Sequence, residues 1–366
     1  MIIERISILN FKNIEEADLT FSPRLNCLFG DNGMGKTNLL DALYYLSFTR
    51  SYTNLPDSQL ITHEKDFMVL QGYYNRNDNS DEIYCGVKRK QKKVFKRNKK
   101  EYDRLSEHIG FIPVVIISPA DIDLIQGGSD ERRKFIDMLI SQYDKEYLHA
   151  LINYNKALYQ RNSLLKKSFS VSDDSLFEIW EEQMSRYGSL IHRKRKTFSA
   201  DFAPVFTEYY RIVSGENETV HFQYQSRLEN DSLSSLLVSG REKDKISGFT
   251  TSGTHKDDFD FLLDDYLIRK IGSQGQNKTY LIALKLAQFN FLSEKGLSPP
   301  ILLLDDLFDK LDAKRAERII HLVAQPEFGQ IFIADTNRNY PDEILNEMQC
   351  DYKLFQVKDG VIRESK

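Results

Sequence analysis

Apolar and polar side chains alternate along residues 2–30, which is the two-residue period of β-strands. This segment ends in a glycine cluster, and a helical pattern follows over Asn38–Ser47. Residues 67–100 predict two or three further strands, and Val114–Ile117 predicts a short buried strand that ends before a proline. Strand patterns return from about residue 218 and then alternate with helices. The order of elements predicts an α/β fold.

A helical period replaces the strand pattern from about Ser129. Two long helical patterns lie on either side of the serine-rich stretch 168–175, and they predict a helical hairpin of about 80 residues. We therefore expect a discontinuous α/β head formed by residues 1–118 and 215–366. Residues 119–214 are expected to form an α-helical arm inserted into that head.

Composition narrows the class of protein. The 366 residues are 41% hydrophobic and 28% charged, which is enough apolar material for a sizeable core. The net charge is −4, so a nucleic-acid surface is expected to be a local patch. Cys27, Cys85 and Cys350 are far apart, which favours reduced thiols over disulfides or zinc ligands. The charged N-terminus and the absence of a long apolar run predict a cytoplasmic protein with no membrane partner.

The glycine cluster fits the P-loop pattern of glycine, four residues, and Gly-Lys-Thr. Such a loop points backbone N–H groups at a phosphate, and the next helix directs its positive end to the same anion. Lys36 would bridge the β- and γ-phosphates, and the Thr37 hydroxyl would bind Mg²⁺. A glycine-rich turn before an ordinary helix is the alternative, and the strand–loop–helix context favours ATP. The candidate nucleotide-binding residues are Gly30, Asp31, Asn32, Gly33, Met34, Gly35, Lys36, Thr37 and Asn38.

An acidic pair follows the apolar run Ile301–Leu304, which is typical of a buried parallel strand. Ligands bind at the carboxyl ends of such strands, so both carboxylates would reach the nucleotide crevice. We expect Asp305 to bind Mg²⁺, directly or through water, and Asp306 to polarise the attacking water as general base. A strand that ends in a polar turn is the alternative, which the P-loop makes less favourable.

A third segment, Ser273-Gln-Gly275-Gln276, precedes a helical pattern 32 residues before the acidic pair. A serine in this place is usually only an N-cap. Here it resembles the signature motif of ABC-type ATPase heads. In those heads the motif contacts the γ-phosphate of a nucleotide held by the opposite subunit. The resemblance implies that Ser273, Gly275 and Gln276 act in trans, and that Asp309 and Asp312 belong to a D-loop.

Motif spacing discriminates among these heads. Ser273 lies 237 residues after Lys36. Transporter ATPases place the two motifs much closer together, whereas Rad50-like and SMC heads insert far longer coiled coils. The transporter alternative would predict association with membrane-protein loops. A kinase or GTPase is a second alternative, but a kinase gives Ser273 no role, and the Asn-Lys-x-Asp motif of GTPases is absent.

The chain resembles the RecF family almost end to end. The matching segments are Leu9–Asn13, the P-loop with Thr37-Asn38, Phe48–Tyr52, Gly127–Asp137, Ser252–Asp258 and Ser273–Gln276. The resemblance implies an ABC-type, Rad50-like ATPase head split by the arm, with ATP and Mg²⁺ as cofactors and Lys12 as a further nucleotide contact. It implies an ATP-driven head-to-tail homodimer in DNA repair and replication restart. Binding of single-stranded, gapped or junction DNA, slow ATP hydrolysis, recruitment of RecR with RecO in the same pathway, and help in loading RecA are also implied.

Some positions depart from the pattern of related heads. Asp306 stands where many ABC-type heads carry glutamate, and its shorter side chain predicts slow hydrolysis. Pro119 occupies the place of the Q-loop glutamine. No histidine follows residues 330–334, so Asp335 and Thr336 are the nearest candidates for the switch position.

A basic stretch at Lys88–Lys100 contains nine cations and no acid in thirteen positions. Alternation on a hairpin would place several of them on one face, where they could bind DNA phosphates. Lysines also protect the edge of a solvated hairpin, and the two interpretations are equally supported. A second run, His192–Lys196, favours a charged helix face over a DNA contact. The DNA candidates are Lys88, Arg89, Lys90, Lys92, Lys93, Lys96 and Arg97.

Overall fold

The computed structural model describes the chain apart from residues 168–174, 216–217, 297, 309–310, 337–350 and 366. It divides into two compact units, which we describe separately. The head unit comprises Met1–Asp121, Ile212–Gly215 and Ile282–Lys366. The arm unit comprises Ile122–Arg211 and Glu216–Leu281. The predicted α/β class with a helical insertion is found, but residues 216–281, expected in the head, group with the arm.

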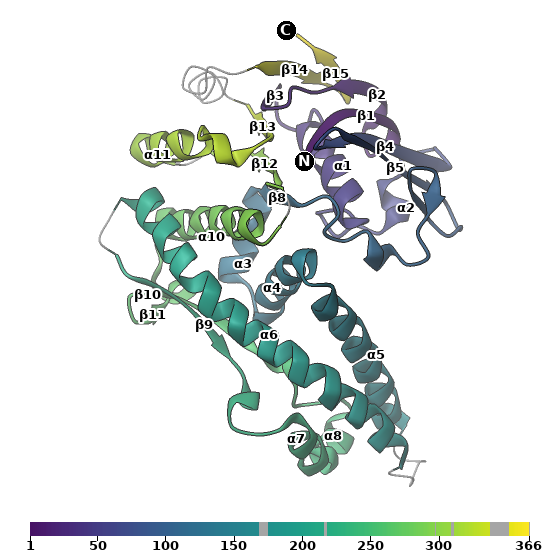
Figure 1. Cartoon of the computed structure of the whole chain (residues 1–366), viewed down its shortest axis with the longest axis vertical. Coiled ribbons are helices and arrows are strands. Elements are labelled where there is room, and N and C mark those ends of the chain that lie inside the picture. The colour runs from purple at the N-terminus through teal and green to yellow at the C-terminus, as the bar shows by residue number, and fades with distance from the viewer. Residues whose placement is uncertain (168–174, 216–217, 297, 309–310, 337–350, 366) are drawn as a thin grey trace. The chain divides into compact units, whose positions relative to one another are not determined.

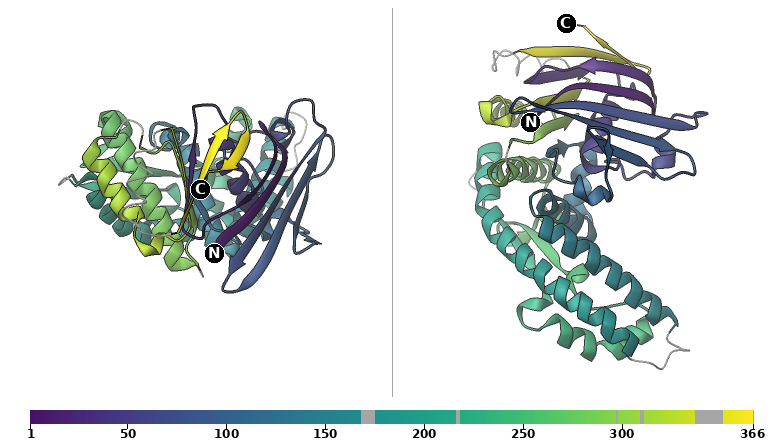
Figure 2. Two further views of the ribbon diagram at one scale, coloured as in Figure 1. Left: turned by 90° about the horizontal axis from the view of Figure 1, so that it is seen from above. Right: turned by 45° about the vertical axis from the view of Figure 1, so that its right-hand side comes forward.

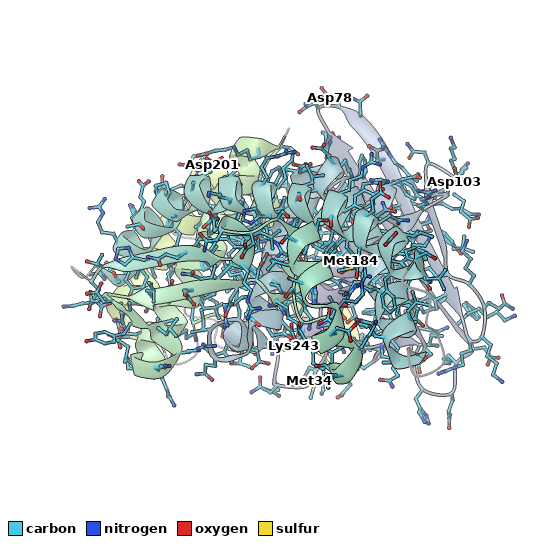
Figure 3. The ribbon with its side chains drawn as sticks, turned by 90° about the horizontal axis from the view of Figure 1, so that it is seen from below. Met34, Asp78, Asp103, Met184, Asp201 and Lys243 are labelled. Atoms are coloured by element: carbon cyan, nitrogen blue, oxygen red, sulfur yellow. The ribbon has the colours of Figure 1, made fainter. Side chains whose placement is uncertain are left out.

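An antiparallel sheet forms one layer of the head unit, with strand order β2-β1-β4-β5-β6-β7. Alternate residues of β1 are buried, and Ile6 and Ile8 lie opposite Gly72 and Leu70 of β4. This is the alternation that the sequence shows. Asp78 marks the exposed end of the β4–β5 hairpin (Figure 3). The strands are β1 Ile2–Phe11, β2 Ile14–Thr20, β4 Phe67–Arg76, β5 Asn79–Lys88, β6 Val94–Arg97 and β7 Lys100–Glu101.

The second sheet of the head unit has the order β15-β14-β3-β13-β12-β8, and all its neighbours pair in parallel except β14 and β15. Strands β8, β12 and β13 are fully buried and are apolar up to the aspartates that end β12 and β13, as expected for strands covered on both faces. The carboxyl ends of β3, β12 and β13 therefore meet at one edge. The strands are β3 Leu25–Phe29, β8 Val114–Ile117, β12 Ile301–Asp305, β13 Ile331–Asp335, β14 Tyr352–Lys358 and β15 Val361–Glu364.

Helix α1 (Lys36–Phe48) lies between the two sheets of the head unit and is buried along almost its whole length. It touches β4 and β1 of the antiparallel sheet and β13 and β12 of the parallel sheet (Figure 2). The predicted helix differs from it by one or two residues at each end. The remaining helical elements are α2 Asp57–Leu60, η1 Leu105–Glu107, η2 Pro119–Asp121, α11 Ala313–Val323, η5 Pro326–Phe328 and the part of α10 (Gln274–Lys295) from Ile282 onward.

Two long helices, α5 (Lys145–Lys167) and α6 (Ser175–Ser214), lie side by side in the arm unit (Figures 1 and 2). Met184 of α6 is fully buried (Figure 3). The serine-rich turn predicted at 168–175 falls mostly outside the described residues. The other elements are α3 Ile122–Gln126, α4 Ser129–Tyr143, β9 Val220–Gln225, η3 Arg227–Glu229, α7 Leu233–Ser239, α8 Arg241–Ser247, η4 Thr254–Lys256, β10 Asp258–Leu263, β11 Tyr266–Leu267, α9 Ile268–Ile271 and the first part of α10.

A small sheet explains why residues 216–281 belong to the arm unit. Strands β9, β10 and β11 pair antiparallel, in the order β11-β10-β9. Phe222 of β9 packs its ring against Phe198 and Phe202 of α6. Such aromatic contacts bury large areas, so the sheet is anchored to the long helix instead of the parallel sheet.

Buried charges also hold the arm unit together. Arg161 of α5 is fully buried, and it pairs with Glu181 of α6 at 2.9 Å and with Asp244 of α8 at 2.7 Å. Removing one partner of a buried ion pair leaves the other charge without compensation in a dry interior. The guanidinium is therefore a structural requirement of this unit.

Replacing Arg161 with methionine is expected to lower the free energy of unfolding by about 3–5 kcal/mol. Urea denaturation followed by circular dichroism measures this loss. The matched control is Lys134→Met, because Lys134 pairs with Glu131 at an exposed position of α4, where such pairs contribute at most about 1 kcal/mol. Equal losses in the two variants would contradict a structural role for Arg161.

Candidate functional site

The loop between β3 and α1 has the backbone of a phosphate cradle. Gly35, which precedes α1, has φ of 115°, a left-handed conformation that favours glycine. A Cβ atom at Gly30 would lie 2.2 Å from the carbonyl oxygen of Val357 in β14, so only glycine fits there. No side chain caps α1, and its first turn holds no acidic residue. The positive end of the helix is therefore available to an anion.

Lys36 is buried and turns back over this loop. Its Nζ donates to the carbonyl oxygen of Gly30 at 2.6 Å and to that of Asp31 at 3.0 Å. These bonds fix the ammonium at the edge of the cradle. It can therefore exchange a carbonyl for a phosphate oxygen without a large change of position.

The predicted magnesium ligands meet at the same edge. The Thr37 hydroxyl donates to the Asp305 carboxylate, with oxygen–oxygen distances of 2.9 and 3.0 Å. Both groups offer the oxygen ligands that Mg²⁺ prefers. Within the part of the chain that the structure describes, no cluster of three His, Cys, Asp or Glu forms a metal cage. Mg²⁺ is usually held by one or two protein groups together with phosphates, and Thr37 and Asp305 are the groups that could hold it here.

The electrostatics of Asp305 suit a metal ligand. Burial, helped by the charges of Asp306 and Asp121, raises its pKa to about 6, although the Thr37 hydrogen bond and the charge of Lys36 oppose this shift. A carboxylate held among other carboxylates is destabilised as an anion. A bound divalent cation would favour the ionised form and relieve that cost.

Asp306 lies at the open end of β12. Its backbone has φ of 43°, and its N–H donates to the carbonyl oxygen of Ala334 in β13. Its side chain is half-buried. The predicted general base therefore stands beside the predicted metal ligand, on the side that solvent reaches.

The structure places Lys12 in an ion pair instead of the loop. Its Nζ lies 2.7 Å from Oδ2 of Asp41, a buried residue one turn after Thr37 on α1. Asp41 also accepts hydrogen bonds from the Ser51 hydroxyl and the Tyr52 N–H. These partners make Lys12 a brace for α1, and its predicted nucleotide contact has no support in this geometry.

Asn13 contacts the glycine loop, whereas Lys12 does not. The sequence pattern did not indicate which of these two neighbours would do so. Its Nδ2 donates to the Met34 carbonyl oxygen at 3.2 Å, and its Oδ1 accepts from Nδ2 of Asn38 at 2.7 Å. A Cβ atom at Gly35 would lie 2.9 Å from that Oδ1. Asn13 therefore supports the loop from the side.

Asp121 is a further polar residue near this edge that the sequence did not indicate, because the family pattern places a glutamine at the position of Pro119. Its carboxylate accepts the Ser118 N–H at 2.9 Å and pairs with the buried Lys285 of α10 at 2.6 Å. Ser118 follows β8, the neighbour of β12. The carboxylate of Asp121, paired with Lys285, therefore lies near the carboxyl end of β8, at the same edge of the parallel sheet. Asp335 is buried at the end of β13, and Thr336 beside it is exposed.

The segment Ser273–Gln276, called the signature segment below, begins α10 in the arm unit. Ser273 is exposed, and Gly275 is half-buried in the first turn, which has no acidic residue. Gln276 makes hydrogen bonds within the protein, so its predicted trans contact would have to compete with them. Asp312 caps α11 by accepting from the Arg315 N–H, and Asp309 lies outside the described residues.

The structure separates the predicted DNA cations into two groups. Lys93 pairs with Asp57, and Arg97 pairs with Asp81 and covers the ring of Phe111. Arg89 donates to backbone carbonyls. These three act in folding. Those left to meet a ligand are the exposed Lys88, Lys90 and Lys92 and the half-buried Lys96.

The run His192–Lys196 is largely used inside the arm unit, as its weaker DNA interpretation anticipated. Arg195 is buried and pairs with Asp137 and Asp257. Lys194 pairs with Asp144, and Lys196 pairs with Glu229.

None of the helices in the described ranges is long and apolar enough to cross a bilayer.

Known proteins resemble this chain over almost its whole length. The family described as RecF/RecN/SMC N terminal domain matches residues 2–363. The DNA replication and repair protein RecF of Azobacteroides pseudotrichonymphae is 66% identical over 364 residues, covering 100% of both chains. That of Bacteroides thetaiotaomicron is 58% identical and covers 100% of this chain and 99% of its own.

Solved structures give the same assignment. The recombination mediator protein RecF with ATP, in the RecFOR pathway, matches with a TM-score of 0.88 and 30% identity, covering 99% of each chain. An Smc head domain from Pyrococcus furiosus, 18% identical and with a TM-score of 0.58, covers 99% of this chain and 95% of its own and shares the fold. The predicted head fold is confirmed, and the chain belongs to the RecF family of DNA replication and repair proteins.

Proposed function

We propose that this chain is an ATP-dependent DNA-binding recombination mediator whose two copies associate head to tail around two ATP molecules. The observation that carries the proposal is the meeting of Lys36, Thr37 and Asp305 beside an uncapped helix end. A structure of RecF with ATP among the solved relatives supports ATP as the ligand. Sedimentation velocity with ATP, with ADP and without nucleotide tests it. Of these three conditions, only the one with ATP should give the dimer.

Each copy would supply half of the ATP site. Lys36 and the N–H groups at the start of α1 hold the phosphates, and Ser273 and Gly275 of the second copy contact the γ-phosphate. Because this last contact exists only when two copies meet, ATP binding favours association. Loss of the γ-phosphate removes the shared contact, so hydrolysis resets the dimer.

The groups proposed for hydrolysis lie at the edge of the parallel sheet. Mg²⁺ held by Thr37 and Asp305 would neutralise charge on the phosphates. Asp306 would accept a proton from the attacking water, and its short side chain agrees with slow turnover. The ATPase reaction would therefore act as a timer.

The name shared by the relatives supports a role in DNA repair and replication. We propose that this chain binds single-stranded, gapped or junction DNA in the cytoplasm, acts with RecR and RecO, and helps to load RecA. The exposed lysines Lys88, Lys90 and Lys92 are the proposed phosphate contacts of the head unit.

Replacing Lys88, Lys90 and Lys92 with glutamine is expected to weaken DNA binding, because each lysine that contacts a duplex phosphate releases counterions. The slope of log affinity against log salt should fall by up to about 0.9 per lost contact. Fluorescence anisotropy over a salt series measures it. The charge-matched control replaces the exposed Lys166, Lys243 and Lys314. An unchanged slope in the first variant would contradict the proposed DNA contacts and favour the interpretation of these lysines as a solvated hairpin edge.

A further inference from the structure

The signature segment is held by reciprocal hydrogen bonds. Oγ of Ser273 accepts from the Gln276 N–H at 3.2 Å, and the Ser273 N–H donates to Oε1 of Gln276 at 2.9 Å. This is the capping box of a helix start. Because the serine oxygen accepts a bond from the backbone, its own hydrogen remains to be donated to an acceptor outside the box.

A carboxylate behind the box fixes the orientation of Gln276. Nε2 of Gln276 donates to Oε1 of Glu218 at 2.7 Å, and the buried Tyr210 donates its hydroxyl to the other oxygen of Glu218. An ionised carboxylate only accepts hydrogen bonds. Glu218 therefore holds the amide with its NH₂ toward itself and its oxygen toward the Ser273 N–H.

We propose that Glu218 is a positioning residue for the signature segment, acting through Gln276 to keep the Ser273 hydroxyl directed outward. The proposal rests on the function proposed above, in which Ser273 meets the γ-phosphate held by a second copy. Neither Glu218 nor Tyr210 touches the nucleotide in this account. Both act on the shape of the segment that does.

The chemistry of position 276 supports this role. A capping box accepts glutamate or glutamine at this position. Glutamate would place a negative charge in the first turn of α10, where the anion is proposed to bind, and would oppose it. Here the amide of Gln276 is neutral. The negative charge lies on Glu218, which is separated from the start of α10 by the Gln276 side chain. The arrangement keeps the capping geometry and leaves the helix end positive.

The test measures ATP-driven dimerisation and ATP affinity of the full chain for Glu218→Ala, Gln276→Ala and the double variant. Glu218→Ala is expected to weaken the ATP-bound dimer about tenfold, the loss of one hydrogen bond to a charged group, and to leave P-loop affinity for ATP unchanged. In the Gln276→Ala background it should add nothing, because Glu218 acts through Gln276. Additive effects of the two changes would overturn the proposal.

Two further variants separate positioning from general stability. Glu218→Gln can still accept from Gln276 through its amide oxygen and can donate its NH₂ to the Tyr210 hydroxyl oxygen, so it should dimerise within about threefold of the unmodified protein. If Glu218→Ala does not fold, Tyr210→Phe gives the milder test, with the same direction expected. The control is Tyr224→Phe, which removes a tyrosine–carboxylate bond to Asp257 elsewhere in the arm unit and should leave dimerisation unchanged. An equal loss in this control would contradict the proposal.

Ser273→Arg distinguishes the two levels of the account. If that variant still dimerises with ATP, the proposed function fails. If it does not dimerise and Glu218→Ala behaves like the unmodified protein, only the role of Glu218 fails.

Discussion

Replacing Ser273 with arginine is expected to abolish ATP-driven dimerisation and to leave ATP binding intact. The exposed serine begins α10, and a long side chain there would hold the second copy away from the phosphate and remove the cap. Loss of a central contact in a desolvated interface raises the dissociation constant by at least about 100-fold. Sedimentation velocity at several protein concentrations measures dimerisation, and fluorescent nucleotide titration measures ATP binding.

Two controls accompany this variant. Ser273→Ala keeps the space open and loses only the hydroxyl, so a smaller effect of about tenfold is expected. The second is Ser232→Ala, which removes the serine cap of α7 and tests cap loss alone. Ser273→Arg that dimerises like the unmodified protein would refute the shared ATP site.

Replacing Lys36 with methionine is expected to weaken ATP binding strongly, since the ammonium is the charged donor that faces the loop. A hydrogen bond to a charged group contributes about 1.5–3 kcal/mol, so affinity should fall about 10- to 100-fold. Titration calorimetry with ATP measures it. Methionine has a similar length and suits a buried position, so the fold should survive.

The matched control for Lys36 is Lys353→Met, which removes a partly exposed lysine paired with Glu364 in the same unit. It should bind ATP normally. If Lys36→Met also keeps its affinity, the loop does not bind phosphate through this lysine.

Local patterns predicted the parts of the fold that depend on neighbouring residues. The alternation around Ile6 and Ile8 and the apolar run Ile301–Leu304 appear as strands because burial of one or both faces follows the side-chain period. The glycine loop also followed from sequence, since its φ values and close contacts demand glycine at fixed spacing.

Contacts between distant residues were beyond these patterns. The pairing of Lys12 with Asp41, and of Lys285 with Asp121, depends on how separate elements meet. The same is true of β9, whose Phe222 packs on α6 and so draws residues 216–281 into the arm unit. In the basic hairpin, sequence could not show that Arg97 is engaged by Asp81. In each case several residues of the same chemical type could have been the partner, and only the folded arrangement shows which one is.

Mixing the Lys36→Met and Ser273→Arg chains tests the central claim most directly. Each chain alone is expected to stay monomeric with ATP. A mixed dimer would contain one complete site, formed by the P-loop of the Ser273→Arg chain and the signature segment of the Lys36→Met chain. At the other site the P-loop holds no ATP, so the arginine meets no phosphate there and has room to fit. Sedimentation of an equimolar mixture should therefore show an ATP-dependent dimer that neither variant gives alone. A mixture that stays monomeric, while the unmodified chain dimerises with ATP, would contradict an ATP site built from two copies.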